Sequence, residues 1–226
     1  MAVVGGLDPA VIDGLTFTID AANKRSYPGS GTTWFDIVGS SNATLTSGPT
    51  FSADNMGIFS FDGTNDIASV QNQLLFSDPQ NLTVEHFTNI SETDNQLYGM
   101  LSNSKRLYHG VYNNYWDIGY GGTSWETSNT TGKQARQLGW NHVTVTVTSG
   151  TAKIYINAVA NTRTITDTSG FSYTSGDPYG IGGYMNPTRN ANYCKANKLS
   201  YLRVYNRGLT ATEVTQNYNV LKYRFQ

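Results

Sequence analysis

The chain has 226 residues, of which 38% are hydrophobic and only 14% charged, and its formal net charge is -1 at pH 7. A near-neutral chain without clusters of Lys and Arg lacks the positive surface that nucleic acids and anionic membranes attract, so we expect neither as a partner. A single cysteine excludes an intrachain disulfide and a cysteine-based zinc cluster. Because all-β domains often run to about 200 to 250 residues as one unit, the length favours one domain.

Residues 1–12 are Gly-rich and aperiodic, and the Asp13-Gly14 turn signal follows them. This pattern predicts an N-terminal arm ahead of a single domain at 13–226. The arm has neither the basic region nor the apolar run of a signal peptide, so we expect synthesis in the cytoplasm without export. Apolar residues in an aperiodic tail are best explained by a partner surface that receives them. The candidate attachment residues are therefore Val3, Val4, Leu7, Val11 and Ile12.

The first strand is predicted where Leu15, Phe17 and Ile19 alternate with polar residues. The pattern then dissolves over 21–39 into a loop punctuated by Pro and Gly. An irregular segment of this length needs apolar anchors of its own, so we expect Trp34 and Phe35 to pin the loop onto the domain.

Two short apolar segments, 58–61 and 67–70, flank a strong turn signal that carries Asp62, Asn65 and Asp66. These side chains offer hard oxygen ligands within one turn, which suits calcium. Asp and Asn are also common turn formers for purely local reasons, so both interpretations stay open. No other cofactor is expected.

Residues 82–87 predict a strand with Leu82, Val84 and His86 on one face and Glu85 on the other. Segments 98–101, 107–112 and 115–120 then predict a meander of short strands. Aromatic residues in and after this meander could stack on sugar rings, or could pack between sheets instead; they are Tyr108, Tyr112, Tyr115, Trp125 and Tyr184. A further short strand is predicted at 179–184.

The clearest periodicity lies in 139–160, where Val143, Val145 and Val147 alternate with threonines before a Ser-Gly turn signal and a second alternating segment. This predicts a central β-hairpin. We expect Trp140, just before it, to plug one end of a core between two sheets.

The last strand is predicted at 199–205, and a short helix follows it. Thr210 with Glu213 three residues later forms a capping-box signature. Val214, Tyr218 and Leu221 then share one helical stripe that can lie against the sheets. The sequence therefore predicts an all-β, two-sheet antiparallel sandwich with one short C-terminal helix.

Four stretches together resemble the concanavalin A-like, laminin-G-like jelly-roll superfamily, in the version common in virion proteins of tailed bacteriophages. They are DAANKRSYPGSGTTWFDIVG at 20–39, FDGTNDIASV at 61–70, the tryptophan-led hairpin at 139–160, and LRVYNRGLTATEVTQNYNVLKYRF at 202–225. Where many relatives carry an acidic pair before the closing strand, this chain has Ser200-Tyr201. That departure argues against a metal or catalytic use of the position.

The superfamily includes β-glucanases, whose chemistry needs two carboxylates about 5 Å apart for retention. The closely spaced acidic pair here, Glu92 and Asp94, lies in a turn-like segment, and Glu85 stands alone on its strand. The histidines, His86, His109 and His142, are far apart in sequence and sit in no nucleophile motif, which favours structural roles. We therefore expect no catalytic residues and no enzyme activity.

The resemblance implies a non-enzymatic structural protein of a phage virion, such as a capsid decoration, vertex or fibre protein, made in the host cytoplasm. Its expected partners are other virion proteins, in the capsid or a fibre, and copies of itself in an oligomer. The alternative is an adhesin or carbohydrate-binding module for glycans of the host surface.

Overall fold

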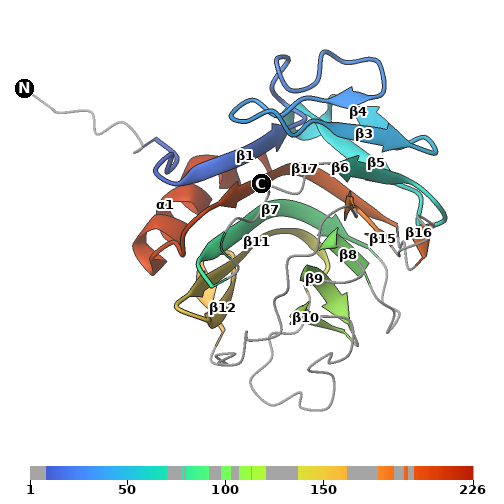
Figure 1. The fold of residues 1–226 in the computed structure, drawn as a ribbon. Coiled ribbons are helices and arrows are strands. Elements are labelled where there is room, and N and C mark those ends of the chain that lie inside the picture. Colours follow the sequence, from blue (N-terminus) through green and yellow to red (C-terminus); the bar gives the residue numbers. More distant parts are fainter. Residues whose placement is uncertain are drawn as a thin grey trace, which may run out of the picture.

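The computed structural model describes residues 9–70, 78, 80–91, 98–102, 107–112, 114–120, 137–161, 178–185, 191–192 and 196–225. Two antiparallel sheets pack against each other as a sandwich, and a helix lies along the outer side of one of them (Figure 1). The jelly-roll-type sandwich with a short C-terminal helix agrees with the fold predicted from the sequence. In the described residues no helix combines the length and the apolar character needed to cross a membrane.

The sheet under the helix is called sheet A. In spatial order its strands are β13 (Val159–Ala160), β12 (Thr151–Ile156), β11 (Gly139–Thr148), β7 (Leu82–Ile90), β17 (Asn197–Tyr205), β5 (Ile58–Phe61) and β4 (Thr50–Ser52), with β1 (Leu15–Asp20) also paired to β17.

The opposite sheet is called sheet B. Its order is β10 (Tyr115–Tyr120), β9 (Leu107–Tyr112), β8 (Tyr98–Ser102), β14 (Tyr179–Ile181), β6 (Ile67–Val70), β3 (Ala43–Thr46) and β2 (Thr33–Trp34). A small ribbon joins β15 (Tyr184–Met185) to β16 (Ala191–Asn192). The short helical turns are η1 (Asp54–Met56) and η3 (Lys222–Arg224), and the main helix is α1 (Ala211–Leu221).

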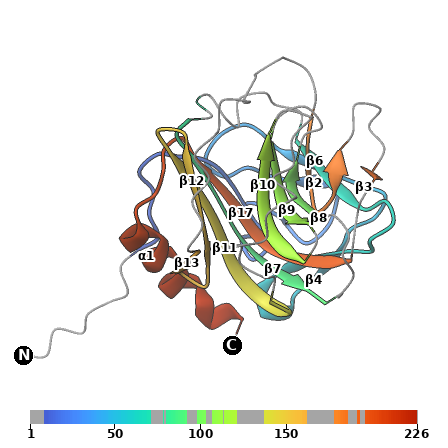
Figure 2. The same cartoon turned by 90° about the horizontal axis from the view of Figure 1, so that it is seen from below.

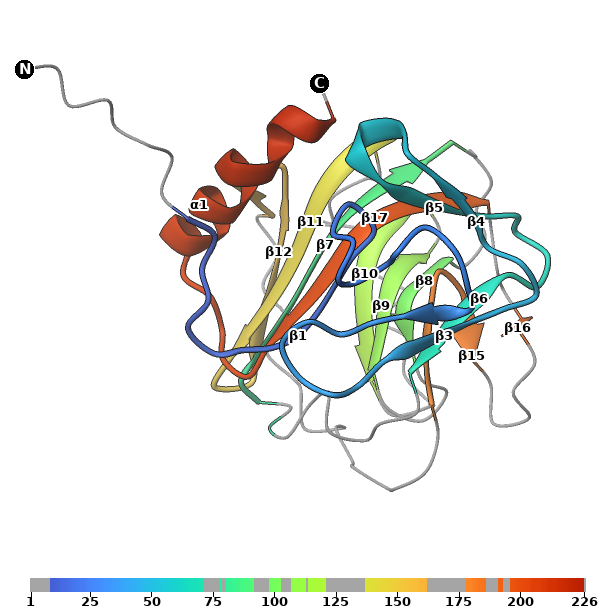
Figure 3. The ribbon, with the colours of Figure 1, turned by 90° about the horizontal axis from the view of Figure 1, so that it is seen from above.

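Strand β17 lies next to β7 in the middle of sheet A, and it changes partner at Ser200. On one side it pairs with β7; on the other it pairs with β5 up to Leu199 and with β1 from Tyr201 onward (Figure 3). The Ser200 hydroxyl donates to the carbonyl of Gly57, and the Ser200 carbonyl accepts from the amide of Ala21. The Ser200-Tyr201 position therefore has a structural role where the two partner strands meet.

The predicted hairpin at 139–160 is confirmed as β11 and β12. Thr148 pairs with Thr151, and the two-residue turn places Ser149 and Gly150 at φ values of 47° and 74°. Primed turns of this kind match the twist of the strands. The valines of β11 are fully buried in the core between the sheets, and Thr144 is buried too because the outer face of sheet A is covered.

Helix α1 lies over that outer face, on the side of β11 and β12 (Figure 2). Its predicted capping box is present: Thr210 Oγ1 accepts from the amide of Glu213, whose carboxylate in turn accepts from the amide of Thr210. Val214 and Leu221 are buried as predicted, but Tyr218 is only half-buried. The fully buried Asn217 was not anticipated on this stripe.

Two predictions about tryptophan and phenylalanine need correction. Trp140 does not plug the core between the sheets, because its ring packs on Phe225, 4.5 Å between centroids, on the helix side of sheet A. Trp34 does anchor its loop in the core, whereas Phe35 next to it is exposed. Trp34 is the last residue of β2 and Phe35 follows the strand, so the strand residue anchors the loop and the residue after it does not.

Candidate functional site

The aromatic candidates of the meander gather on β9 and β10. His109 and Val111 on β9, and Trp116 on β10, are buried toward the core. Because successive strand positions alternate between faces, positions 108 and 112 lie on the opposite, outward face of sheet B. Tyr112 pairs directly with Tyr115, which is half-buried, and Tyr108 pairs with Gly119. The register thus brings Tyr108, Tyr112 and Tyr115 onto one face.

The remaining aromatic candidates are not joined to this group. Tyr184 starts β15 and pairs with Asn192 in the separate ribbon. Trp125 lies outside the described residues. The pair Glu92 and Asp94 also lies outside them, so the interpretation of that segment as a turn stays a prediction.

The turn at 62–66 is organised by its own hydrogen bonds. Asp62 Oδ1 accepts from the amides of Thr64, Asn65 and Asp66, and Asp66 Oδ2 accepts from the amide of Asp62. The Thr64 amide and its neighbours lower the pKa of Asp62, while burial raises the pKa of Asp66. Within the described residues, no group of three His, Cys, Asp or Glu side chains is placed to hold a metal ion. A calcium role for Asp62, Asn65 and Asp66 stays an untested expectation.

The inner end of the predicted arm is bound to the domain. The Val11 amide donates to Asn217 Oδ1 at 2.8 Å, and its carbonyl accepts from the Tyr205 hydroxyl at 3.1 Å. Val11 is buried in a cluster with Leu209 and Val214, so it is not presented to a partner. Ile12 is 79% exposed. Val3, Val4 and Leu7 lie outside the described residues.

A buried polar network beneath α1 was not found by the sequence analysis. Glu85 is fully buried on the outer face of sheet A. Its Oε1 accepts from the Tyr201 hydroxyl at 2.8 Å and lies 3.2 Å from His142 Nε2 and 3.7 Å from Arg203 Nη1. Its Oε2 accepts from Asn217 Nδ2 at 2.6 Å.

The network keeps Glu85 ionised. Burial would raise the pKa of Glu85, but the hydrogen bond and charge of His142, the charge of Arg203 and the Tyr201 hydroxyl together lower it to about 2. A carboxylate that accepts several hydrogen bonds beside positive charge favours its charged form. The isolated Glu85 in a strand pattern was the one signal in the sequence, because a lone acidic residue on a strand needs a buried partner if its face is covered.

A second buried pair joins the two sheets. His86 of β7 and His109 of β9 are fully buried, and their Nε2 atoms are 2.9 Å apart. The Trp116 ring lies beside both, with centroid distances of 5.6 Å to His86 and 5.8 Å to His109. His142 lies on the other face of sheet A, with Glu85. All three histidines are fully buried, and His86 and His109 meet although they are far apart in the sequence.

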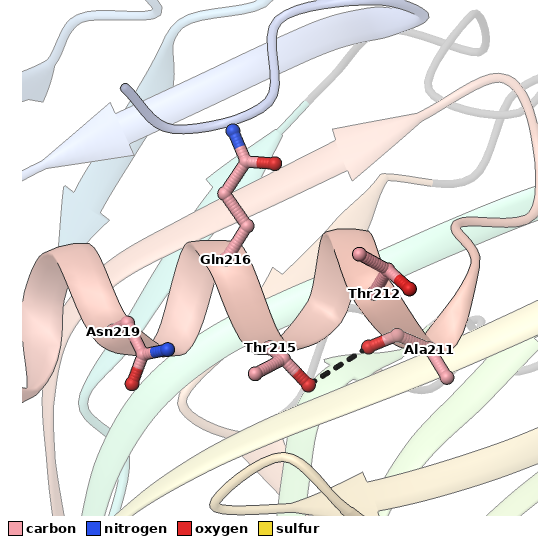
Figure 4. A pocket seen from close by; sticks show the side chains of 5 residues that line it. All are labelled: Ala211, Thr212, Thr215, Gln216 and Asn219. Atoms are coloured by element: carbon pink, nitrogen blue, oxygen red, sulfur yellow. Dashed lines mark hydrogen bonds between the residues drawn. The ribbon is translucent and has the colours of Figure 1, made fainter. Parts of the chain in front are cut away.

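An open depression of about 420 Å³ lies on the solvent side of α1. Its described lining is Ala211, Thr212, Thr215, Gln216 and Asn219 (Figure 4). Thr215 Oγ1 donates to the Ala211 carbonyl, and Gln216 Nε2 donates to the Pro9 carbonyl. These described side chains carry neither a ring nor an ionisable group, so the face of β9 and β10 is the stronger candidate for ligand binding.

Comparison with known proteins gives one family match. The family described as the concanavalin A-like lectin/glucanases superfamily matches residues 62–215, more than half of the chain. A search of curated protein sequences finds no match.

Solved structures with the same fold belong to larger chains. The sialidase of Trypanosoma rangeli in complex with sialic acid has a TM-score of 0.64 at 14% identity, over 93% of this chain and 33% of that chain. The receptor-binding domain of botulinum neurotoxin type G has a TM-score of 0.63 at 14% identity, over 92% of this chain and 51% of that chain. The binding domain of botulinum neurotoxin serotype D has a TM-score of 0.63 at 13% identity, over 92% of this chain and 52% of that chain. The chain thus spans a third to a half of these proteins, and the similarity shows the fold alone.

Proposed function

Since the chain belongs to the concanavalin A-like lectin/glucanases superfamily, we propose that it is a non-enzymatic binding protein that contacts its partner through the outward face of β9 and β10. The observation that carries this proposal is the register that puts Tyr108, Tyr112 and Tyr115 on one face. Tyrosine contributes a large, rigid, amphipathic contact area at low entropic cost, and it is enriched where binding energy concentrates.

Glycan is the ligand class that best suits this face. Gly110 and Gly119 occupy strand positions beside the tyrosines, and Asp117 pairs with Gly110. Glycine leaves room for a ligand to approach the backbone. Aromatic rings can stack on sugar rings while a carboxylate accepts hydrogen bonds from sugar hydroxyls. The fold of the neurotoxin receptor-binding domains is consistent with a binding role.

A binding role without catalysis is supported by the carboxylates of the described residues. Glu85 is shut between sheet A and α1, where a polysaccharide cannot reach it. Asp20 is paired with Arg224, and Glu213 with Arg207. A retaining glycosidase needs two carboxylates facing one substrate bond, and each of these three is instead held by a partner inside the domain.

We propose a tailed-phage particle as the setting, with the protein as a capsid decoration, vertex or fibre component. The sequence resemblance at 20–39, 61–70, 139–160 and 202–225 supports this setting. The alternative setting is a host-glycan adhesin or a carbohydrate-binding module outside the particle.

A glycan array with the purified protein tests the binding face. We expect binding that falls about tenfold or more in Tyr112→Ala and in Tyr115→Ala, since these two positions pair directly on that face. Tyr223→Ala is the matched control, because Tyr223 is 61% exposed on η3, next to α1, and should leave binding unchanged. Equal effects of the three substitutions, or no glycan bound at all, would reject the glycan proposal.

The setting has its own test. Mass spectrometry and antibody labelling of purified phage particles should find the protein in many copies over the head if it is a decoration protein, and in few copies at the tail if it is a fibre protein or adhesin. Its absence from particles would reject the virion setting while leaving a glycan-binding result intact.

Catalysis can be checked on the same preparation. We expect no release of reducing ends from β-glucans or bacterial exopolysaccharide. Release that disappears in Glu92→Gln or Asp94→Asn would show that this acidic pair is catalytic.

A further inference from the structure

The N-terminal segment 9–13 is bound to the domain through its backbone. Asn217 and Tyr205 close a ring of hydrogen bonds around Val11. The Val11 amide donates to Asn217 Oδ1 at 2.8 Å, Asn217 Nδ2 donates to the Tyr205 hydroxyl at 3.0 Å, and that hydroxyl donates to the Val11 carbonyl at 3.1 Å. The donor and the acceptor of one residue are thus both paired, as in the recognition of an extended peptide.

One side chain of the segment anchors it. Val11 is buried in a cluster with Leu209 and Val214, whereas Ile12 beside it is 79% exposed. This place, formed by Asn217, Tyr205 and the cluster, is called the Val11 seat. It holds the segment as a groove holds a short peptide, by main-chain hydrogen bonds and one apolar anchor.

The other contacts of the segment follow the same rule. Gln216 Nε2 donates to the Pro9 carbonyl, and Figure 4 shows this side chain pointing away from the lining residue Thr215 toward the N-terminal segment. Arg207 Nε lies 3.1 Å from the Asp13 carbonyl and 2.9 Å from its carboxylate. All of these are non-covalent contacts to side chains of the domain, so the segment of another copy can make each of them.

The Val11 seat is expensive to empty. Asn217 Nδ2 also donates to Glu85 Oε2 at 2.6 Å, so the ring around Val11 is connected to the buried carboxylate. Withdrawing Val11 removes the partners of Asn217 Oδ1 and of the Tyr205 hydroxyl, and it exposes the apolar cluster. A second segment of the same sequence restores every one of these contacts. Exchange of the segment is therefore favoured over its simple release.

A single turn separates the segment from β1. The Leu15 amide donates to the Ile12 carbonyl at 3.1 Å, and Gly14 has a φ of 75°. Glycine populates negative φ about as readily as positive φ, so rotation at Gly14 can straighten the turn and continue β1 toward residue 9. Short turns of this kind are the hinges at which chains exchange segments.

We propose that two copies of this chain exchange their 9–13 segments, so that Val11 of each copy fills the seat of the other in a two-fold symmetric dimer. A second copy is the occupant because it carries the same Val11 for the cluster and the same Asp13 for Arg207. The exchange also accounts for Ile12, whose exposed side chain lies next to the hinge. In the dimer the two hinges meet at the symmetry axis, and each Ile12 is buried there.

The proposal does not depend on glycan binding. The Val11 seat lies on the helix side of sheet A, whereas the tyrosine face belongs to the outer side of sheet B. Size-exclusion chromatography with light scattering of the ligand-free full chain should give about twice the 24.7 kDa of one chain at high concentration, and one chain after dilution. This measurement gives the oligomeric state but not the contact.

A mixed-label sample identifies the contact. Half of the copies carry ¹³C-labelled Val and Leu methyl groups and half are unlabelled, and the mixture is diluted and concentrated again to scramble the dimers. Isotope-filtered NOE spectra should then show contacts between Val11 methyl groups of one copy and those of Leu209 and Val214 of the other. The wild-type sequence is used throughout, so no variant has to fold.

Three substitutions test the interface. Val11→Asp places a carboxylate in the seat and should abolish the dimer. Ile12→Asp leaves the seat intact, so it should weaken dimerisation about tenfold or more while the Tm of the monomer stays unchanged. Met56→Asp is the matched control, because Met56 is 70% exposed and lies outside the segment and its seat; it should change neither.

Three results would overturn the proposal: a monomer at every concentration, a dimer whose Val11 contacts stay within one chain, or equal effects of Ile12→Asp and Met56→Asp. If Val11→Asp does not fold, the NOE contacts and the comparison of Ile12→Asp with Met56→Asp decide.

Discussion

The side-chain amide of Asn217 donates a 2.6 Å hydrogen bond to Oε2 of Glu85, and this contact joins α1 to the middle of sheet A. The same amide nitrogen donates to the Tyr205 hydroxyl at 3.0 Å, and Asn217 Oδ1 accepts from the amide of Val11. One side chain thus connects the helix, β7, β17 and the N-terminal segment. Because all of these groups are buried, losing Asn217 leaves several of them without a partner.

Asn217→Ala should therefore be strongly destabilising. We expect a loss of about 3 kcal/mol in the free energy of unfolding, since a hydrogen bond to a charged group and two further bonds disappear from a buried site. Urea unfolding measures the loss. Asn219→Ala on the same helix is the matched control, because Asn219 is half-buried and accepts from Lys222; its effect should stay within about 0.5 kcal/mol. Equal losses in both variants would contradict the role given to Asn217.

Glu85→Gln should destabilise the protein in a pH-dependent way. At neutral pH the variant leaves the buried Arg203 without its counter-charge, at a cost of about 3 kcal/mol. The pKa of Glu85 is lowered from 4.5 to about 2, so its contribution to stability is complete above pH 4.5 and is lost as the pH falls toward 2. Urea unfolding of both proteins should show a gap at pH 7 that narrows in this window. A gap independent of pH would contradict the assignment.

Two truncations separate attachment from folding at the N-terminus. Deleting residues 2–8 should change the free energy of unfolding by less than about 0.5 kcal/mol. Deleting 2–12 also removes the buried Val11, and it should cost about 2 kcal/mol. If 1–8 attach the protein to a particle, the shorter truncation folds normally but loses its place there. Full occupancy of the particle by this truncation would reject the attachment role.

Calcium can be tested at the 62–66 turn. Because the Asp62 carboxylate already accepts three backbone amides, we expect the same Tm in calcium and in chelator. A ligand that binds only the folded state raises the Tm by mass action, so bound calcium would appear as a higher value. A rise that is abolished by Asp62→Asn would show that the turn is a calcium site.

Local patterns in the sequence were sufficient for several elements of this fold, although they did not predict the short strands β2, β3 and β4. The alternation of Val143, Val145 and Val147 predicted one buried face of β11, and Thr210 with Glu213 predicted the start of α1. Both features depend on residues within a few positions of each other, where the period of a strand or the reach of a cap determines the structure. The same reasoning separated His86 from Glu85 onto opposite faces of β7.

What lies against each face was decided by the tertiary structure. Strand alternation says that Glu85 and His86 point in opposite directions, but not that a helix 132 residues away brings Asn217 to Glu85, or that a strand of the other sheet brings His109 to His86. Trp140 was assigned to the wrong side of sheet A for the same reason. Its aromatic character requires burial, and both faces of sheet A are covered, one by sheet B and one by α1 and η3. The need for burial does not determine which of two covered faces Trp140 lies on. The register of β11 and the path of the distant C-terminal segment determine it.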